Sequence, residues 1–133
     1  MNLGETLPLT VPTTKHRQIL DLTERINESV SAAPAAALCH LFLTHTTAAL
    51  TTADLDPGTD LDLLDAFEVM VPKLAYRHPH DPSHVGDHIL SALIGTSLVL
   101  PLKRGQLVLG TWQRVVLIEF DGPRTRTIIL TPS

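Results

Sequence analysis

Histidines are the residues of this chain whose number and spacing most resemble those of metal ligands. Seven occur among 133 residues, and four of them lie between positions 78 and 88. His84 and His88 are four residues apart, so on a helix both rings would project from one face, a standard arrangement of two metal ligands. His78 and His80 alternate, which places them on one side of an extended segment. The cluster would suit zinc or another divalent transition metal, although a single histidine is more often a surface or satisfied core residue.

A second set of polar residues follows an apolar strand. His40 and His45 bracket the end of that strand, and Thr46 and Thr47 come next. Hydroxyl groups at a strand end can donate to a phosphate, but threonine is also common in strands for its β-propensity alone. Cys39 is the single cysteine and lies inside the apolar run, so we expect a buried, inert thiol.

Trp112 and Gln113 form a third polar and aromatic position. They follow Gly110, and a glycine allows a ligand or another backbone to approach closely. The alternative interpretation of the only tryptophan is a core side chain.

Glu119 is a carboxylate whose position requires a partner. It shares a face of an expected strand with Leu117, so it lies beside an apolar side chain. A carboxylate on the core side is costly unless it is paired or bound to a metal or ligand. We therefore predict that Glu119 faces the histidine site or an arginine. Arg124, across the turn, would then bind phosphate.

Charge is distributed unevenly along the chain. It has 14 acidic and 10 basic residues, a net charge of −4, and half of the basic residues follow position 100. Arg124 and Arg126 alternate near the C-terminal end and could hold a small phosphorylated ligand, or could simply be solvated. Only 4% of the residues are aromatic, which together with the acidic balance argues against a nucleic-acid partner. No apolar run approaches membrane-spanning length, so we expect a cytoplasmic chain without a membrane partner.

The elements that must position these residues follow from periodicity and turn signals. We expect one domain over 1–133, because its length suits a single core. Apolar stripes predict helices from Leu22 to Ser31, from Thr59 up to Pro72, and from about His84 to Ile94. β-signals predict strands at 7–11, 16–20, 38–43, 97–102, 106–111, 114–120 and 125–130. Consecutive strands joined by hairpin turns, with helices between others, indicate an α+β fold with mostly antiparallel sheet.

Three local details accompany these elements. Asp21 and Glu24 have the spacing of a capping box at the first helix. Leu63, Phe67 and Met70 would form the core face of the second helix. The prolines near the first strand suit an edge position.

Several motifs together resemble the YjbQ family, also called UPF0047, over nearly the whole chain. They are His-Thr-Thr-Ala at 45–48, Asp-Pro at 56–57, Tyr-Arg-His at 76–78, Gly-Thr-Trp-Gln at 110–113 and Asp-Gly-Pro-Arg at 121–124. The resemblance implies two packed, mostly antiparallel β-sheets with about three helices, assembled as a homotrimer. It also implies thiamine-phosphate synthase activity, in which hydroxymethylpyrimidine diphosphate and thiazole phosphate give thiamine phosphate and pyrophosphate.

Site residues are carried over by position. The resemblance implies a metal site at His45, His78 and His88, with zinc the expected ion; His40 is a weaker match, and His80 and His84 are not required. We expect the ring of His84 to point to solvent. Substrate binding is assigned to Thr46, Thr47, Trp112, Gln113 and Arg124. Glu119 and Arg124 are the candidate catalytic residues.

One segment departs from the family pattern. Between the His-Thr-Thr-Ala motif and the Asp-Pro pair the family usually carries Asn-Glu-Asn. In this chain the stretch is one residue shorter and lacks the two amides and the glutamate, and Asp54 is the carboxylate that could replace the glutamate. Two alternatives therefore stay open. One is a trimer that binds a metal or metabolite without catalysis. The other is a phosphoester hydrolase that uses a metal-bound water.

Overall fold

Two antiparallel β-sheets form the frame of the molecule. The computed structural model describes residues 2–79 and 81–133. The five-stranded sheet has the order β1-β8-β3-β5-β6 and the three-stranded sheet the order β2-β7-β4. The strands are β1 (Leu7–Pro12), β2 (Gln18–Asp21), β3 (Leu38–Leu43), β4 (Ala48–Ala53), β5 (Ser97–Lys103), β6 (Gln106–Leu107), β7 (Arg114–Glu119) and β8 (Thr125–Pro132). Every pairing between these strands is antiparallel, which confirms the expected α+β class.

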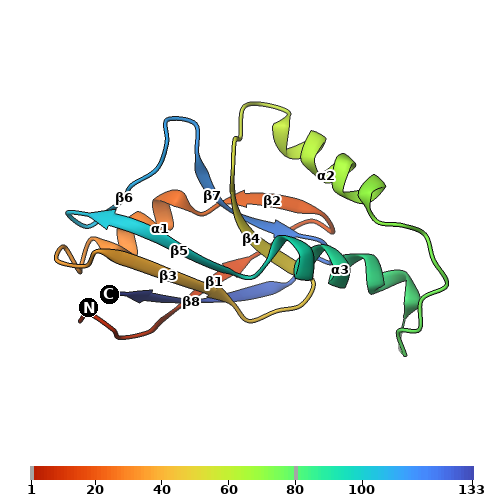
Figure 1. Ribbon diagram of the computed structural model, residues 1–133, viewed down its shortest axis with the longest axis horizontal. Helices are drawn as coiled ribbons and strands as arrows, with labels where there is room; N and C mark the ends of the chain where they lie inside the picture. Colours follow the sequence, from red (N-terminus) through yellow and green to blue (C-terminus); the bar gives the residue numbers. More distant parts are fainter. Residues whose placement is uncertain (1, 80) are drawn as a thin grey trace.

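Three α-helices complete the fold: α1 (Thr23–Val30), α2 (Thr59–Met70) and α3 (Val85–Ile94), the last preceded by a 3₁₀ turn, η1 (Pro82–His84). In Figure 1, α2 and α3 lie at one end of the molecule, away from the chain termini. None of the helices that the structure describes is long and apolar enough to span a membrane.

The apolar residues form two cores on the two faces of the three-stranded sheet. The first lies between the sheets and includes Ile26 of α1, Leu41 of β3 and Leu117 of β7. The second lies under α2 and α3, where Leu64 and Leu90 pack on the opposite face of the same sheet. Strand β7 is therefore buried on both faces, which explains its unbroken run of apolar residues.

Strand β4 was not predicted. Its three alanines have low strand propensity, and the strand-favouring Thr51 and Thr52 do not add an alternating apolar pattern. Small residues are needed there because α3 lies against the strand, and the Ser91 hydroxyl donates to the Ala48 carbonyl at 2.7 Å. The strand predicted at 106–111 is also shorter, since β6 contains only Gln106 and Leu107.

The predicted capping box is half right. Helix α1 begins at Thr23, whose amide donates to the Asp21 carboxylate at 3.0 Å, as predicted for a cap by Asp21. Glu24 accepts from the Arg114 guanidinium of β7 at 2.8 Å instead of reaching back, and Asp21 accepts from the same guanidinium at 2.7 Å. This arrangement ties the start of α1 to the central strand.

Other local predictions were partly right. Leu63 and Phe67 of α2 do pack on the second core, but Met70 is exposed and Leu64 is the buried residue of that helix. Strand β1 is an edge strand, as its prolines indicated. Cys39 is buried, and this burial raises the pKa of its thiol to about 11. A thiolate therefore does not form near neutral pH.

Candidate functional site

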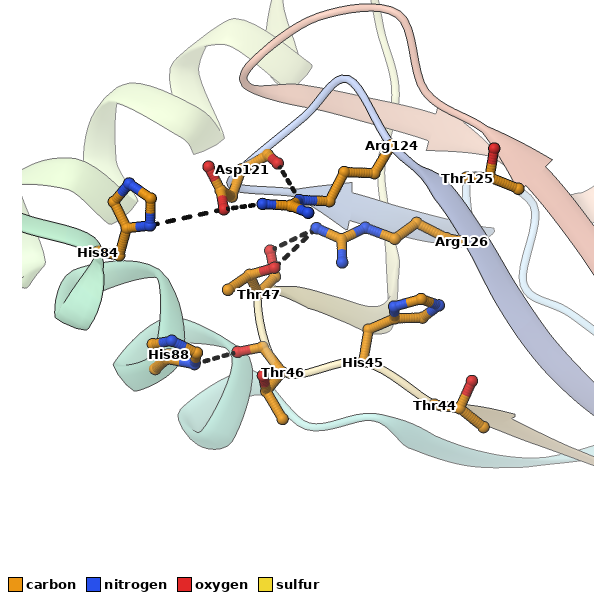
Figure 2. A pocket seen from close by; sticks show the side chains of 10 residues that line it. All are labelled: Thr44, His45, Thr46, Thr47, His84, His88, Asp121, Arg124, Thr125 and Arg126. Carbon is orange, nitrogen blue, oxygen red and sulfur yellow. Dashed lines mark hydrogen bonds and ion pairs between the residues drawn. The ribbon is translucent and has the colours of Figure 1, made fainter. Parts of the chain in front are cut away.

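A pocket of about 630 Å³ opens where three segments meet: the connection from β3 to β4, the start of α3, and the turn from β7 to β8 (Figure 2). It brings together residues from distant parts of the sequence. The lining residues are Thr44, His45, Thr46, Thr47, His84, His88, Asp121, Arg124, Thr125 and Arg126. We call this cavity the phosphate pocket, after the ligand that the sequence analysis predicts for Arg124.

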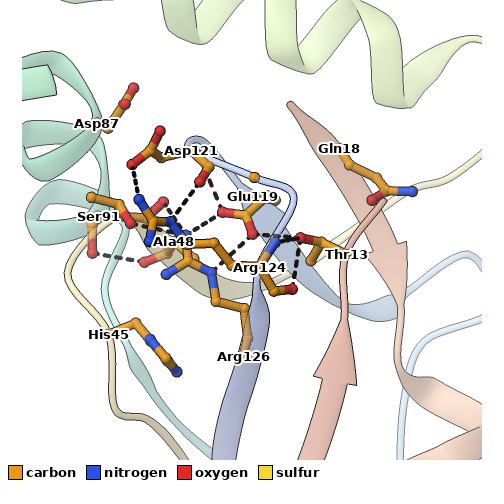
Figure 3. A network of polar contacts seen from close by, with 12 residues as sticks. Thr13, Gln18, His45, Ala48, Asp87, Ser91, Glu119, Asp121, Arg124 and Arg126 are labelled. Atoms are coloured by element: carbon orange, nitrogen blue, oxygen red, sulfur yellow. Dashed lines mark hydrogen bonds and ion pairs between the residues drawn. The ribbon is translucent and has the colours of Figure 1, made fainter. Parts of the chain in front are cut away.

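A buried ion pair forms the floor of this region. Glu119 is 0% and Arg126 2% exposed. The Arg126 Nε donates to Glu119 Oε1 at 2.9 Å, and its Nη2 pairs with the other carboxylate oxygen. The Thr13 hydroxyl and the Asp121 amide also donate to this carboxylate, at 2.7 and 3.2 Å (Figure 3). The expectation that Glu119 faces an arginine is thus confirmed, with Arg126 as the partner.

These contacts keep Glu119 ionised. Burial by itself would raise its pKa, but the hydrogen bonds from Arg126, Thr13 and the Asp121 amide outweigh burial and lower the pKa below its ordinary value of 4.5. Both carboxylate oxygens are occupied, so Glu119 acts on the pocket by positioning Arg126. Its assignment as a catalytic residue stays a prediction.

Arg126 of β8 and Arg124 of the preceding turn both line the phosphate pocket. The Nη2 of Arg126 donates to the hydroxyl and carbonyl of Thr47, at 2.8 and 3.2 Å, and so holds the β3–β4 connection in place. Arg124 donates through Nε to the Asp121 carbonyl at 2.7 Å and through Nη2 to the Asp121 carboxylate at 2.8 Å. Among the described residues, neither Nη1 group donates a hydrogen bond.

His45 is held as a neutral ring. The Thr127 amide donates to its Nε2 at 2.9 Å, so this nitrogen is an acceptor. Burial and the nearby Arg126 charge lower the pKa of His45. In the neutral ring the proton is then on Nδ1, and neither nitrogen offers a free lone pair to a metal.

The two other predicted metal ligands lie together, apart from that ring. His78 and His88 stack with ring centroids 5.0 Å apart. The Nδ1 of His88 donates to the Thr46 carbonyl at 3.0 Å, which leaves its Nε2 as an acceptor. Residues 2–79 and 81–133 contain no group of three or more His, Cys, Asp or Glu side chains that could hold one metal ion. The donor set of a single chain therefore does not fit a three-histidine zinc site.

The side chain of His84 is 42% exposed, as expected for a ring that is open to solvent, but the ring also has partners. His84 precedes α3, and its ring lies between two carboxylates: Nε2 is 3.2 Å from Asp81, and Nδ1 is 3.8 Å from Asp121. His40 is outside the phosphate pocket, where its Nε2 contacts the Ser97 hydroxyl at 2.7 Å. His80 lies outside the described residues.

Trp112 and Gln113 lie at the other end of β7 from the phosphate pocket. Trp112 is 71% exposed beside Asp54 and Asp56, and Gln113 donates to the Thr52 hydroxyl at 3.0 Å. The structure therefore brings together Thr46, Thr47 and Arg124 but does not bring these two predicted substrate-binding residues to them. Asp54 likewise accepts from Thr59 and does not reach the phosphate pocket.

Arg126, His84 and Asp121 also line the phosphate pocket. The sequence offers Arg126 as a possible phosphate contact and His84 as a possible metal ligand, but the final site assignment includes none of the three. A signal for Arg126 was present, because it shares a strand face with Ile128 and Leu130, both of which are buried. A basic residue on a core face requires a partner, because a buried charge is costly unless it is paired, as for Glu119. Asp121 carries no comparable local signal.

Comparison with known proteins places the whole chain in one group. Residues 8–133 match the family model described as "UPF0047 protein YjbQ-like". A UPF0047 protein of Archaeoglobus fulgidus is 37% identical over 125 residues, covering 93% of this chain and 98% of the relative. The UPF0047 protein YugU of Bacillus subtilis is 33% identical, covering 90% of this chain and 92% of the relative.

Solved structures agree with this placement. The crystal structure of a hypothetical protein from Aeropyrum pernix has a TM-score of 0.87 and 34% identity, covering 97% of this chain and 98% of the other. A conserved hypothetical protein from Thermus thermophilus has a TM-score of 0.85 and 35% identity, covering 96% and 99%. The order of strands, the motifs around the phosphate pocket and these similarities lead to one conclusion: the chain belongs to the UPF0047 (YjbQ-like) family.

Proposed function

We propose that the protein binds a small phosphorylated metabolite in the phosphate pocket. The observation that carries the proposal is the pair of guanidinium groups at Arg124 and Arg126, which come from alternate positions and line one pocket together with four threonines. Guanidinium groups bind phosphate oxygens through planar, charge-assisted hydrogen bonds.

The donors that remain available support this ligand class. Each arginine retains an Nη1 group that is not bonded within the described residues. The Thr47 hydroxyl accepts from Arg126, so its own proton is available for donation. The Nδ1–H of His45 adds a neutral donor. Because Asp121 and Glu119 already balance the two positive charges, we expect moderate affinity that depends on geometry more than on net charge.

The reaction that we propose is thiamine-phosphate synthesis. The bond between the hydroxymethyl carbon and the diphosphate breaks, a bond forms from that carbon to the thiazole nitrogen, and pyrophosphate leaves with the electron pair. The thiazole nitrogen carries no proton, so the step needs no general base. In this pocket Arg124 and Arg126 would stabilise the negative charge on the departing pyrophosphate, which is the main catalytic requirement of such a step.

Calorimetric titration with pyrophosphate tests the binding proposal. Arg124→Ala should weaken pyrophosphate binding by about 1.5–3 kcal/mol, the scale of a hydrogen bond to a charged group. Lys103→Ala is the matched control, because Lys103 is an exposed cation on β5, outside the lining of the phosphate pocket, and should leave affinity unchanged. Equal affinity of the parent and Arg124→Ala would show that Arg124 is only a solvated turn residue.

Phosphorus NMR with both precursors tests the reaction separately from binding. Release of pyrophosphate together with thiamine phosphate would support the synthase. Pyrophosphate binding without turnover would favour the non-catalytic metabolite-binding alternative. Release of inorganic phosphate from a phosphoester, dependent on added metal, would identify the hydrolase instead.

The zinc expected from the resemblance stays a prediction. His88 has the hydrogen-bond pattern of a ligand, since its Nδ1 donates to a carbonyl and orients Nε2. If the purified protein holds zinc, His88→Ala should remove most of it, and His84→Ala should leave zinc content nearly unchanged, as measured by atomic emission. Equal losses from both variants would contradict this assignment.

A further inference from the structure

A second cavity, which the proposed function does not use, lies on the other side of the η1–α3 junction. Its volume is about 500 Å³, and it is lined by residues of the segment that follows α2. Figure 1 shows this segment running from the end of α2 toward α3. Its apolar walls include Val71, Leu74 and Leu90, with the ring of Tyr76. The Tyr76 hydroxyl donates to the Pro72 carbonyl and closes this segment on itself.

Four charged side chains line this second cavity: Glu68 and Lys73 are exposed, while Arg17 and Asp87 lie together and are less exposed. The side chain of Asp87 is 7% exposed, and its carboxylate is 3.5 Å from Arg17 Nη2. This distance is longer than the roughly 2.7–2.9 Å typical of a charge-assisted hydrogen bond. Among the described residues Asp87 has no closer polar partner, and Arg17 Nη1 is buried without any acceptor. Figure 3 shows Asp87 near Asp121, at the edge of the buried polar network rather than within it.

The long contact between Arg17 and Asp87, and the Arg17 Nη1 group without an acceptor, define the ligand chemistry. Arg17 needs an acceptor, and Asp87 needs a donor, within an apolar cavity of small-molecule size. Such a combination of apolar walls and a few converging polar groups is typical of ligand sites. A neutral group that carries a donor and an acceptor side by side can bond to both Asp87 and Arg17. A carboxylate would be repelled by Asp87, and an amidinium would be repelled by Arg17.

We propose that this second cavity binds a small aromatic molecule with an adjacent hydrogen-bond donor and acceptor, of the aromatic carboxamide or aminoazine class. The proposal is independent of the function assigned to the phosphate pocket. His84 and His88 line that pocket, while Ser83, Gly86 and Asp87 line the second cavity, so the two sites lie on opposite sides of one helical segment.

Three probes of the same size test the proposal on the unaltered protein. Benzamide carries a donor and an acceptor, benzoate only acceptors, and benzamidine only donors. In ¹H–¹⁵N correlation spectra, benzamide should shift the amides of Gly86, Asp87 and Leu90 with saturation. Benzoate and benzamidine should bind about tenfold more weakly, because each leaves one buried charged group unmatched. No saturable shift with benzamide, or shifts confined to other segments, would overturn the proposal.

A variant then tests the role of Asp87. Asp87→Asn removes the negative charge that opposes benzoate, so the preference should reverse in favour of benzoate. Loss of stability alone cannot reverse a preference between two probes. The matched control is Asp62→Asn on the exposed face of α2, which should keep the parent order. An unchanged probe order in Asp87→Asn would contradict the assignment, and the three-probe comparison on the parent remains decisive if that variant does not fold.

Discussion

At Glu119 and Arg126 two full charges lie almost out of contact with water. Removal of two ions from water costs several kcal/mol each, and the pair is tolerable only if further hydrogen bonds satisfy both groups. Here Thr13, Thr47 and the Asp121 amide provide those bonds. The same contacts place the Arg126 guanidinium at the phosphate pocket, so one arrangement serves both folding and the proposed binding site.

Removal of one partner should therefore be severe. Arg126→Met leaves the Glu119 carboxylate buried without its counterion, and we expect the free energy of unfolding to fall by about 3–5 kcal/mol. Urea denaturation followed by circular dichroism measures this. The control is Arg124→Ala, two positions earlier in the chain, where the side chain is 53% exposed and the loss should stay within about 1 kcal/mol. Equal losses from both variants would contradict the burial argument.

The pH dependence of stability follows from the same carboxylate. Because the folded pKa of Glu119 lies below its ordinary value of 4.5, the unfolded chain takes up a proton first as the pH falls. The Glu119–Arg126 pair makes its full contribution to the free energy of unfolding when the pH is above the ordinary pKa of 4.5. This contribution is lost as the pH falls from that value toward the folded pKa. Urea midpoints between about pH 6 and about pH 3 test this, and the double variant Glu119→Leu, Arg126→Met should lose less stability in acid. An identical acid loss in both proteins would show that other groups carry the effect.

At the scale of elements, the turn from β7 to β8 sets the position of Arg124. Gly122 donates its amide to the His16 carbonyl at 2.9 Å, and this bond holds the turn against the segment that precedes β2. A Cβ atom at Gly122 would lie 2.8 Å from the Glu119 Cγ and closer still to the Lys15 carbonyl oxygen. The turn therefore has no space for a side chain.

Gly122→Ala should displace this turn. We expect a loss of about 1–3 kcal/mol in unfolding free energy, the usual range for an added methyl group in a packed site. Pyrophosphate binding should weaken as well, because Arg124 moves with the turn. Gly110→Ala provides the control, since a Cβ atom there would have its nearest neighbour at 3.6 Å. Thermal unfolding and calorimetry on both variants measure the difference; a Gly122→Ala protein as stable as Gly110→Ala would rule out the packing argument.

For the whole molecule, the two sheets and the α2–α3 layer leave one broad face uncovered. On β3, Leu38 and Phe42 alternate with buried residues and point away from the core, and Val99 lies beside them on β5. Exposed apolar residues on neighbouring strands are typical of an interface between protein chains. Together with the resemblance, this face supports the homotrimer that we propose.

Sedimentation equilibrium tests the assembly. At micromolar concentration we expect three times the 14.5 kDa chain mass. Val99→Glu should shift the mass toward that of one chain, because it places a charge in the apolar face. Val69→Glu, on the exposed side of α2, should leave the mass unchanged. A parent protein that sediments as a monomer or dimer would contradict the proposed trimer.

The local sequence determined the fold class, most element boundaries and the need for a partner at Glu119. Alternation of apolar residues reports which face of a strand is buried, and Gly95 ends α3 because the helix cannot continue through it in this backbone conformation. These features depend on residues close together in the chain, so a pattern reveals them. The local sequence did not determine which arginine pairs with Glu119. Arg126 meets Glu119 only after β7 and β8 have been placed on different sheets.

Only the tertiary structure decided how the polar groups are used. The Thr127 amide, 82 positions away, occupies His45 Nε2 and so withdraws that ring from the predicted metal site. Strand β4 pairs with β7 and lies against α3, although the alanines at its start have little strand preference of their own. The choice of hydrogen-bond partner depends on contacts between distant segments, and residue type and spacing do not encode it. For this reason the sequence located the chemistry-bearing residues, while the packing of sheets and helices determined which of them share a pocket.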